Sequence, residues 1–195
     1  MRRVCSGLGV IVFCVLSAAS TLRAQAIQQF DYRVVATTKT STMEKELNQN
    51  ADLGYRFLTV MGGETAFGGK EVVSIMVRSG ISQPRFEYKL LATNKTSTMQ
   101  KELQEASDGG FDYRGQTVFE STFGGKEVSC ILERDRNNRS PSVYRYELLA
   151  TSKTSTMEKE LKQWGDQGYE ALGMTIGKTA LGGNELVTIM RKQVR

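Results

Sequence analysis

Ala36-Thr-Thr-Lys-Thr-Ser-Thr-Met43 returns as Ala92-Thr-Asn-Lys-Thr-Ser-Thr-Met99 and again as Ala150-Thr-Ser-Lys-Thr-Ser-Thr-Met157. Around this stretch the chain repeats itself without a gap over residues 30–78, 86–134 and 144–192, each 49 residues long. A period of this size indicates an array of small units. The fold question therefore reduces to the structure of one unit and to how three units meet.

Each copy of the stretch predicts the start of a helix. Ser41-Thr-Met-Glu44, Ser97-Thr-Met-Gln100 and Ser155-Thr-Met-Glu158 have the form of a capping box, in which the serine accepts from a backbone amide and the side chain three residues later reaches back. Met43, Leu47 and Ala51 then recur at helical spacing as an apolar stripe. A glycine follows in each copy where a helix commonly ends in a left-handed residue, namely Gly54, Gly110 and Gly168.

Strands are expected on both sides of the helix. Each unit opens with an alternating, β-favouring run, which in the first unit is Phe30–Ala36 and carries a tyrosine that we expect in the core or between units (Tyr32, Tyr88, Tyr146). Two more apolar runs follow the helix and are separated by paired glycines that indicate turns with positive φ, Gly68-Gly69, Gly124-Gly125 and Gly182-Gly183. Each unit is therefore predicted to be β-α-β-β, a small antiparallel or mixed sheet with one helix, in the α+β class.

The last strand of the unit predicts how units meet. In the first unit Val72 and Met76 point to one face, and Val73 and Ile75 point to the other. A strand that is apolar on both faces is covered on both faces, and the helix of the unit can cover one of them. A unit of 49 residues also buries little surface by itself. We therefore expect three units packed together in a pseudo-threefold arrangement, with separate beads as the alternative.

Residues 1–26 have the features of a secretory signal peptide. Arg2 and Arg3 precede the apolar stretch Val10–Ala19, and Ala24-Gln25-Ala26 offers a cleavage site. The apolar stretch is shorter than the ~20 residues of a spanning helix, which disfavours a retained anchor. The protein is therefore predicted to be periplasmic or secreted, with no membrane attachment after cleavage.

Composition argues against several classes of function. The chain has 26 basic and 21 acidic residues, and the signal peptide removes three arginines and no acid, so the remainder is nearly balanced and nucleic acid is not expected as a partner. The chain has no histidine, and Cys130 is the one cysteine beyond the signal peptide. The usual general base, the Ser-His and Cys-His pairs and a zinc set are therefore missing. We predict no catalytic residue, no metal and no cofactor, and we expect Cys130 to be buried.

The best candidate for a ligand site is the polar part of the repeated stretch. It consists of one lysine, one threonine and one serine in each unit, namely Lys39, Thr40, Ser41, Lys95, Thr96, Ser97, Lys153, Thr154 and Ser155. These residues lie at the predicted helix N-termini, where backbone amides and the helix dipole favour anions. A phosphate, sulfate or carboxylate is the ligand that they suit. The competing interpretation is that the serine caps the helix, the threonine fits the turn and the lysine is solvated.

The third unit carries a family resemblance. It reads Leu161-Lys-Gln-Trp-Gly-Asp-Gln-Gly-Tyr-Glu170 and ends in an apolar strand closed by Arg191. This pattern resembles the small bacterial YjzH-like domains of unknown function, whose helix runs L-N-x-x-G-x-x-G-[WY]-E. The first unit departs from it at Ala51 and Arg56, and the second at Ser107 and Asp112. The resemblance implies a compact α+β unit and supplies no catalytic residue.

Taken together, these patterns predict a non-catalytic binding or interaction protein whose three units offer several equivalent contacts. Its partner is predicted to be an unidentified protein or an anionic ligand. The alternative is a small-anion or acidic-glycan binder that uses the three Lys-Thr-Ser-Thr turns.

Overall fold

The computed structural model describes residues 29–66, 69–80, 82–93, 95–120, 126–178 and 184–194. Within these residues the protein has nine strands and three helices and belongs to the α+β class, as predicted. The predicted signal peptide, residues 1–26, lies outside the described residues.

The elements follow the order β-α-β-β three times, which is compatible with three repeated units. Unit 1 contains β1 (Phe30–Thr37), α1 (Thr40–Asp52), β2 (Arg56–Thr65) and β3 (Gly69–Ser79). Unit 2 contains β4 (Phe86–Thr93), α2 (Thr96–Asp108), β5 (Asp112–Glu120) and β6 (Lys126–Asp135). Unit 3 contains β7 (Tyr144–Thr151), α3 (Thr154–Gly165), β8 (Glu170–Lys178) and β9 (Asn184–Gln193).

Each unit has one antiparallel sheet with the same strand order. The orders are β1-β3-β2, β4-β6-β5 and β7-β9-β8, so the last strand of a unit is its central strand. The second strand of each unit has a bulge, between Phe57 and Thr59 in unit 1 and at the equivalent residues of units 2 and 3. A bulge shifts which face the following side chains point to. Strand β5 of the middle unit contacts β2 of unit 1 and β8 of unit 3.

The helices begin two residues earlier than the capping boxes predict. Their N-cap residues are Lys39, Lys95 and Lys153, and none of the three helices has a side-chain cap. The start is held instead by a threonine two residues earlier: Thr37 Oγ1 accepts from the Lys39 N–H at 3.1 Å, and Thr93 and Thr151 make the same contact. The serine cap was therefore a wrong prediction, because this threonine turn starts the helix before Ser41 is reached.

The ends of the helices agree with the sequence. Gly54, Gly110 and Gly168 have φ values of 84°, 82° and 85°, in the left-handed region predicted for them. Among the paired glycines, Gly69 has a φ of 69°. The other paired-glycine turns lie outside the described residues.

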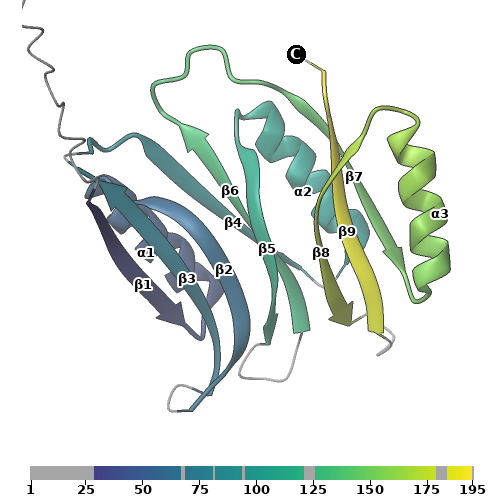
Figure 1. The fold of residues 1–195 in the computed structure, drawn as a ribbon, viewed down its shortest axis with the longest axis horizontal. Coiled ribbons are helices and arrows are strands. Elements are labelled where there is room, and N and C mark those ends of the chain that lie inside the picture. The colour runs from purple at the N-terminus through teal and green to yellow at the C-terminus, as the bar shows by residue number, and fades with distance from the viewer. Residues whose placement is uncertain are drawn as a thin grey trace, which may run out of the picture.

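The three units lie in a row (Figure 1). Helix α1 packs between its own sheet and strand β4 of unit 2, and α2 packs in the same way against β7 of unit 3. Strand β2 lies beside β5, and β5 lies beside β8. Among the described residues, the main contacts between units thus join units that are neighbours in the sequence. The predicted pseudo-threefold arrangement is not confirmed, because unit 2 lies between units 1 and 3 and contacts one of them on each side (Figure 1).

Hydrophobic cores cross the boundaries between units. The core around Met43 and Leu47 of unit 1 includes Tyr88, Phe119 and Ile131 of unit 2. The core around Met99 and Leu103 of unit 2 likewise includes residues of unit 3, namely Tyr146 and Ile189. Neighbouring units therefore share apolar surface and are not separate beads.

The prediction of a doubly covered last strand holds for two of the three units. Strands β6 and β9 bury side chains on both faces. In β3 the face of Val72 and Met76 is buried, but Val73 and Ile75 on the other face are only half-buried, so the prediction holds there for one face. Cys130 of β6 is fully buried, as predicted, and burial raises the pKa of its thiol.

Candidate functional site

Helix α1 covers the open edge of strand β4. The side-chain amide of Asn48 donates to the Tyr88 carbonyl oxygen at 2.8 Å, and the Asn48 side-chain oxygen accepts from the Tyr88 N–H at 2.9 Å. Glu44 accepts from the N–H of Leu90 at 2.8 Å. An uncovered strand edge is a template for pairing with another chain. Unit 1 therefore closes the edge that unit 2 would otherwise expose.

Helix α2 closes the edge of strand β7 with different side chains. Gln104 donates to the Tyr144 carbonyl oxygen at 3.0 Å and accepts from the Tyr146 N–H at 3.4 Å. Ser107 Oγ donates to the same carbonyl at 3.1 Å and accepts from the Tyr144 N–H at 2.9 Å. Gln104 is the equivalent of Asn48 in the repeat. The same position of the repeat therefore makes the edge contact at both junctions, and an amide side chain occupies it each time.

A tyrosine hydroxyl crosses each junction. The Tyr88 hydroxyl accepts from the N–H of Phe57 at 2.7 Å and donates to Glu133 at 2.9 Å. The Tyr146 hydroxyl accepts from the N–H of Tyr113 at 3.1 Å and donates to Asp112 at 3.3 Å. Burial is the main cause that raises the pKa of both tyrosines, so both hydroxyls remain donors at neutral pH.

The two junctions carry ion pairs of opposite orientation. At the first, Arg56 of unit 1 binds Glu133 of unit 2 at 2.8 Å, and this hydrogen bond raises the pKa of the guanidinium. At the second, Asp112 of unit 2 pairs with Arg191 of unit 3. Arg56 and Asp112 are equivalent in the repeat, and so are Glu133 and Arg191. If the units were exchanged, like charges would meet, so this pairing specifies the order of the units.

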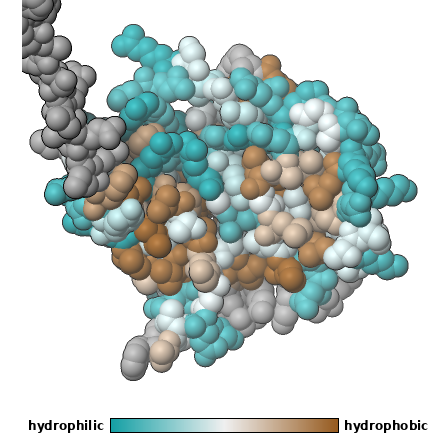
Figure 2. Space-filling view, viewed as in Figure 1, coloured by the Kyte–Doolittle hydropathy of each residue, from teal (hydrophilic) through white to brown (hydrophobic). Residues whose placement is uncertain are grey.

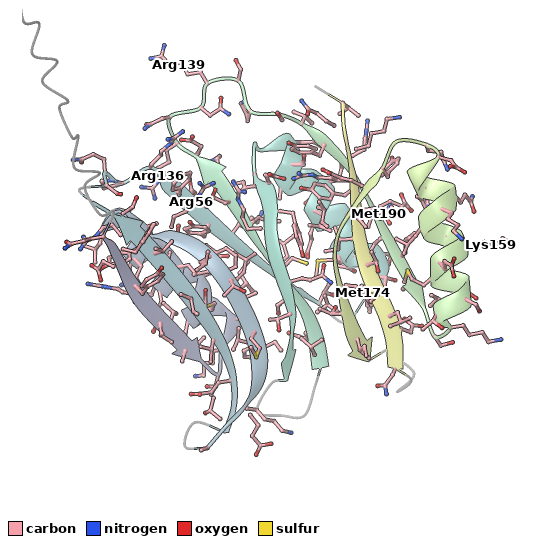
Figure 3. All side chains as sticks on the ribbon, viewed as in Figure 1. Arg56, Arg136, Arg139, Lys159, Met174 and Met190 are labelled. Carbon is pink, nitrogen blue, oxygen red and sulfur yellow. The ribbon has the colours of Figure 1, made fainter. Side chains whose placement is uncertain are left out.

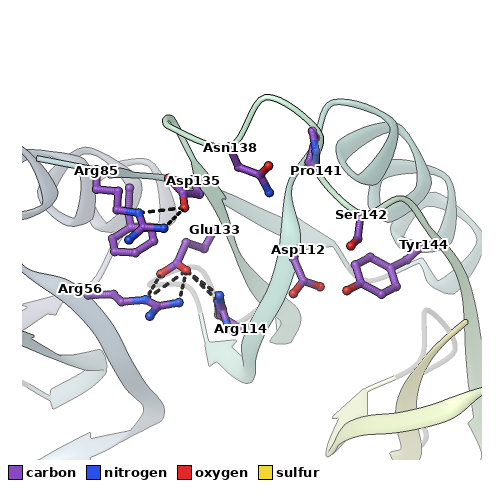
Figure 4. Close-up of a pocket in the computed structure, with 12 residues that line it drawn as sticks. Arg56, Arg85, Asp112, Arg114, Glu133, Asp135, Asn138, Pro141, Ser142 and Tyr144 are labelled. Atoms are coloured by element: carbon purple, nitrogen blue, oxygen red, sulfur yellow. Dashed lines mark hydrogen bonds and ion pairs between the residues drawn. The ribbon is translucent and has the colours of Figure 1, made fainter. Parts of the chain in front are cut away.

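A cleft of about 250 Å³ opens beside the Glu133 ion pairs (Figure 4). Its charged walls are three arginines and three carboxylates, namely Arg56, Arg85, Arg114, Asp112, Glu133 and Asp135. Glu133 is bound by Arg56 and by Arg114, the latter at 2.7 Å. Arg85 binds Asp135 at 2.8 Å and lowers the pKa of that carboxyl. Each carboxylate of the cleft has a guanidinium partner, so the group of charges is suited to holding units together rather than to acid–base chemistry.

Units 2 and 3 each use one surface to contact the preceding unit. The equivalent surface of unit 1 has no cover among the described residues. The head face is defined here as the five exposed apolar side chains Phe30, Tyr32, Val34, Leu58 and Met61 on β1 and β2. Tyr32 is 57% exposed, whereas its equivalents Tyr88 and Tyr146 are 2% and 4% exposed. Hydrophobic side chains gather over the strands of unit 1 in the space-filling view (Figure 2). Tyr32 pairs with β3 in the register of Tyr88 with β6, so its outer N–H and C=O groups form an open edge.

Unit 3 presents the opposite surface. The tail face is defined as Glu158, Lys162, Ala171, Met174 and Ile176 on α3 and β8. Met174, labelled in Figure 3, and Ile176 are 58% and 63% exposed, while Val60 and Gly62, their equivalents in unit 1, are half-buried beside β5. Helix α3 accordingly buries Met157, whereas α1 buries three residues of its stripe. The head and tail faces thus correspond to the two halves of the internal junction, each without its counterpart among the described residues.

The nine residues of the predicted anion site lie at three separate helix starts. Lys39, Lys95 and Lys153 are exposed, each next to the first residue of a different helix. None of the nine lines the cleft of Figure 4. Ser97 lines a second cleft, of about 650 Å³, with Gln100, Gln104 and Tyr146 at the junction of units 2 and 3. The structure does not bring the three turns into one of these clefts, and ligand binding by them stays a prediction.

Metal and membrane sites have no support in the part of the chain that is described. Its cysteine, aspartate and glutamate side chains form no group of three or more that could hold a metal ion. None of its helices has the length and apolarity needed to cross a bilayer.

Comparison with protein-family models, with curated proteins and with solved structures finds no match for this chain. The resemblance to YjzH-like domains stays a prediction. The function therefore has to be argued from the geometry of the head and tail faces.

Sequence reasoning grouped Tyr32, Tyr88 and Tyr146 and did not separate the exposed one from the buried ones. The residue type is the same at all three positions, so it contains no signal. Two signals were nevertheless present in the aligned repeats. The first is that unit 3 has Lys162 at the position of Asn48 and Gln104. The second is that the charges at the junction positions reverse between the first and the second junction.

Proposed function

We propose that this protein is an exported, non-catalytic interaction module, built from three repeats of one unit, that binds a protein partner through the head face. The observation that carries the proposal is the contrast between Tyr32 and Tyr88. They occupy the same place on the first strand of a unit, yet one is 57% exposed and the other is 2% exposed under the neighbouring helix and strand.

The chemistry of the head face favours a protein over a small molecule. It combines a row of exposed apolar side chains with the outer N–H and C=O groups of β1, which face away from β3 and have no partner among the described residues. Exposed apolar patches mark interaction surfaces, and open strand edges recruit polypeptide through main-chain hydrogen bonds. The internal junctions show what fits such a surface: an amphipathic helix with polar side chains four residues apart, as in Glu44 and Asn48.

Site-specific photo-crosslinking tests this proposal. A photoreactive amino acid in place of Val34, on the head face, should give a discrete adduct in cells that express the protein at its natural level. The matched control places the same amino acid at Lys159, whose equivalents Lys45 and Lys101 remain exposed at the internal junctions. If position 34 gives no adduct beyond those of position 159, the head face is not a binding site.

Anion binding at the helix starts is the second candidate function. It is supported by the lack of a side-chain cap at all three helices, which leaves the backbone amides of the first turn to other acceptors. Phosphate or sulfate should then raise the melting temperature, and more weakly as neutral salt is added. The combined Lys39→Ala, Lys95→Ala and Lys153→Ala variant should lose that increase. An unchanged response in this variant would assign the turns a purely structural role.

A further inference from the structure

The exposed apolar residues at the two ends of the row are the equivalents of residues that are buried or half-buried inside it. Phe30, Tyr32 and Val34 of unit 1 correspond to Phe86, Tyr88 and Leu90 of unit 2, which pack into the core of unit 1. Among the remaining exposed positions, Leu58 corresponds to Leu172, which packs into the core of unit 2. The head face therefore has the composition of a surface that this chain covers twice elsewhere.

The tail face has the matching composition for the other half of the junction. Met174 corresponds to Gln116 of unit 2 and to Val60 of unit 1. The Gln116 amide donates to Thr175 of unit 3 at 3.1 Å, and Val60 packs against the core of unit 1. On α3, Glu158 and Lys162 hold the positions of Glu44 and Asn48. They are exposed and pair with each other. No described residue makes the contacts with them that units 2 and 3 make with α1 and α2.

The hydrogen-bonding groups of the two faces also correspond. Glu158 can accept from the Val34 N–H, as Glu44 accepts from the Leu90 N–H. Lys162 can donate to the Tyr32 carbonyl oxygen, as Asn48 donates to that of Tyr88. The N–H of Ala171 can donate to the Tyr32 hydroxyl, as the N–H groups of Phe57 and Tyr113 donate to the tyrosines of the next unit.

From this correspondence we propose that the partner of the head face is a second copy of this chain, which docks its tail face there and continues the row. The proposal rests on the head face being the binding site. A contact between two different faces leaves one head face and one tail face free at the ends of the assembly. Copies therefore form open rows, or rings if the rotation closes. The two internal junctions of the chain are two instances of this contact.

The contact between copies differs from the internal junctions in one respect. The positions that carry the internal ion pairs are held by Glu170 and Val77, and Glu170 is already paired with Arg191 of its own unit at 2.7 Å. The contact between copies therefore lacks an ion pair, and Lys162 cannot accept from the Tyr32 N–H as Asn48 does from Tyr88. We accordingly expect association that depends on protein concentration, unlike the covalently tethered internal junctions.

Complementation between two blocked variants tests the proposal. Val34→Asp blocks the head face and Ile176→Asp blocks the tail face; both side chains are more than half exposed, so neither change should unfold the protein. In sedimentation velocity the parent should form species larger than a monomer as its concentration rises to about 1 mM, where even a millimolar dissociation constant is detected. Each variant alone should be monomeric. Their equimolar mixture should give a dimer of one copy of each, because one intact head and one intact tail remain.

Each alternative result has a defined meaning. A parent that stays monomeric over this range, or a mixture that stays monomeric, overturns self-association. Larger species from Val34→Asp or Ile176→Asp alone also overturn it, because they require a contact of one face with itself. Lys159→Asp is the matched control and should behave as the parent. If self-association fails while the crosslinker at position 34 still captures a different protein, the head face remains a binding site with another occupant; if both fail, the proposed function fails as well.

Discussion

Unit 1 and unit 2 carry the same tyrosine at the centre of the same strand, and the two tyrosines have opposite surroundings. Tyr88 is buried, and its hydroxyl and backbone groups are hydrogen-bonded by Phe57, Glu133 and Asn48. Tyr32 is 57% exposed on the head face. The difference teaches that the environment of a position in this fold is decided by the neighbouring unit. The unit has two complementary sides, and a side contributes to stability where its counterpart is present.

The largest expected effect comes from removing the buried tyrosine. Tyr88→Ala should lower the free energy of unfolding by about 3–5 kcal/mol, because it leaves a cavity in the core of unit 1 and removes the partner of the Phe57 N–H. Tyr32→Ala should lower it by less than about 1 kcal/mol, since an exposed side chain loses little. Denaturant unfolding of the two variants at low protein concentration measures both. Equal losses would break the comparison.

The ion pairs provide the next effect and sharpen the comparison between the two junctions. Arg56→Asp should destabilise by about 2–3 kcal/mol, because it removes charged hydrogen bonds to the buried Glu133 and sets two carboxylates together. Adding Glu133→Arg and Arg114→Leu rebuilds the first junction with the residue types of the second, Asp112, Arg191 and Leu172. This triple variant should recover most of the loss. A triple variant that is no more stable than Arg56→Asp would show that the charges do not specify the order of units.

Alkaline pH should act on the buried junctions. Burial raises the pKa of Tyr88, Tyr113 and Tyr146 above the ordinary value of about 10. Below that value the stabilisation from their protonated forms is fully present; above it the unfolded chain loses protons that the folded chain keeps, so stability falls. The slope is up to about 1.4 kcal/mol per pH unit for each tyrosine. Tyr88→Phe should flatten the decline measured by unfolding between about pH 10 and 11, and an unchanged decline would contradict this prediction.

The smallest effect concerns the helix starts. Thr37→Ala should cost about 1 kcal/mol, because Thr37 is buried and its hydroxyl holds the N–H of Lys39. Ser41→Ala should cost less than about 0.5 kcal/mol, because Ser41 is exposed inside the first turn and caps nothing. Thermal unfolding of the pair distinguishes them. A larger loss for Ser41→Ala would restore the capping box.

Most of the unit could be predicted from its sequence because its signals are local. The apolar stripe of Met43, Leu47 and Ala51 and the left-handed glycines such as Gly54 each depend on a few neighbouring residues, and the structure confirms them. The helix start was misplaced because a serine followed three residues later by glutamate fits a capping box, while Thr37 competes for the same turn. Local pattern alone cannot decide between two such polar groups.

The arrangement of the units could be predicted less well because it depends on long-range contacts. A strand that is apolar on both faces indicated that both faces are covered, which is true of β6, whereas the second face of β3 is only half-buried. The sequence contains no signal that distinguishes a closed threefold arrangement from an open row, because both arrangements bury the same two faces of a middle unit. The candidate surface was missed for the same reason. The head face consists of residues of unit 1 whose equivalents in units 2 and 3 are covered by a preceding unit, and the residue types alone do not show which copy is uncovered.

Hydrogen exchange at single residues tests the central claim most directly. In dilute protein the amides of Tyr88 and Leu90, which donate to the side chains of Asn48 and Glu44, should be protected, whereas those of Tyr32 and Val34 should exchange at rates close to those of unstructured peptide. Protection at Tyr32 and Val34 should then rise as the protein concentration is increased. Equal protection of the two pairs in dilute protein would contradict the account, because it would mean that the edge of β1 is already covered as the edge of β4 is.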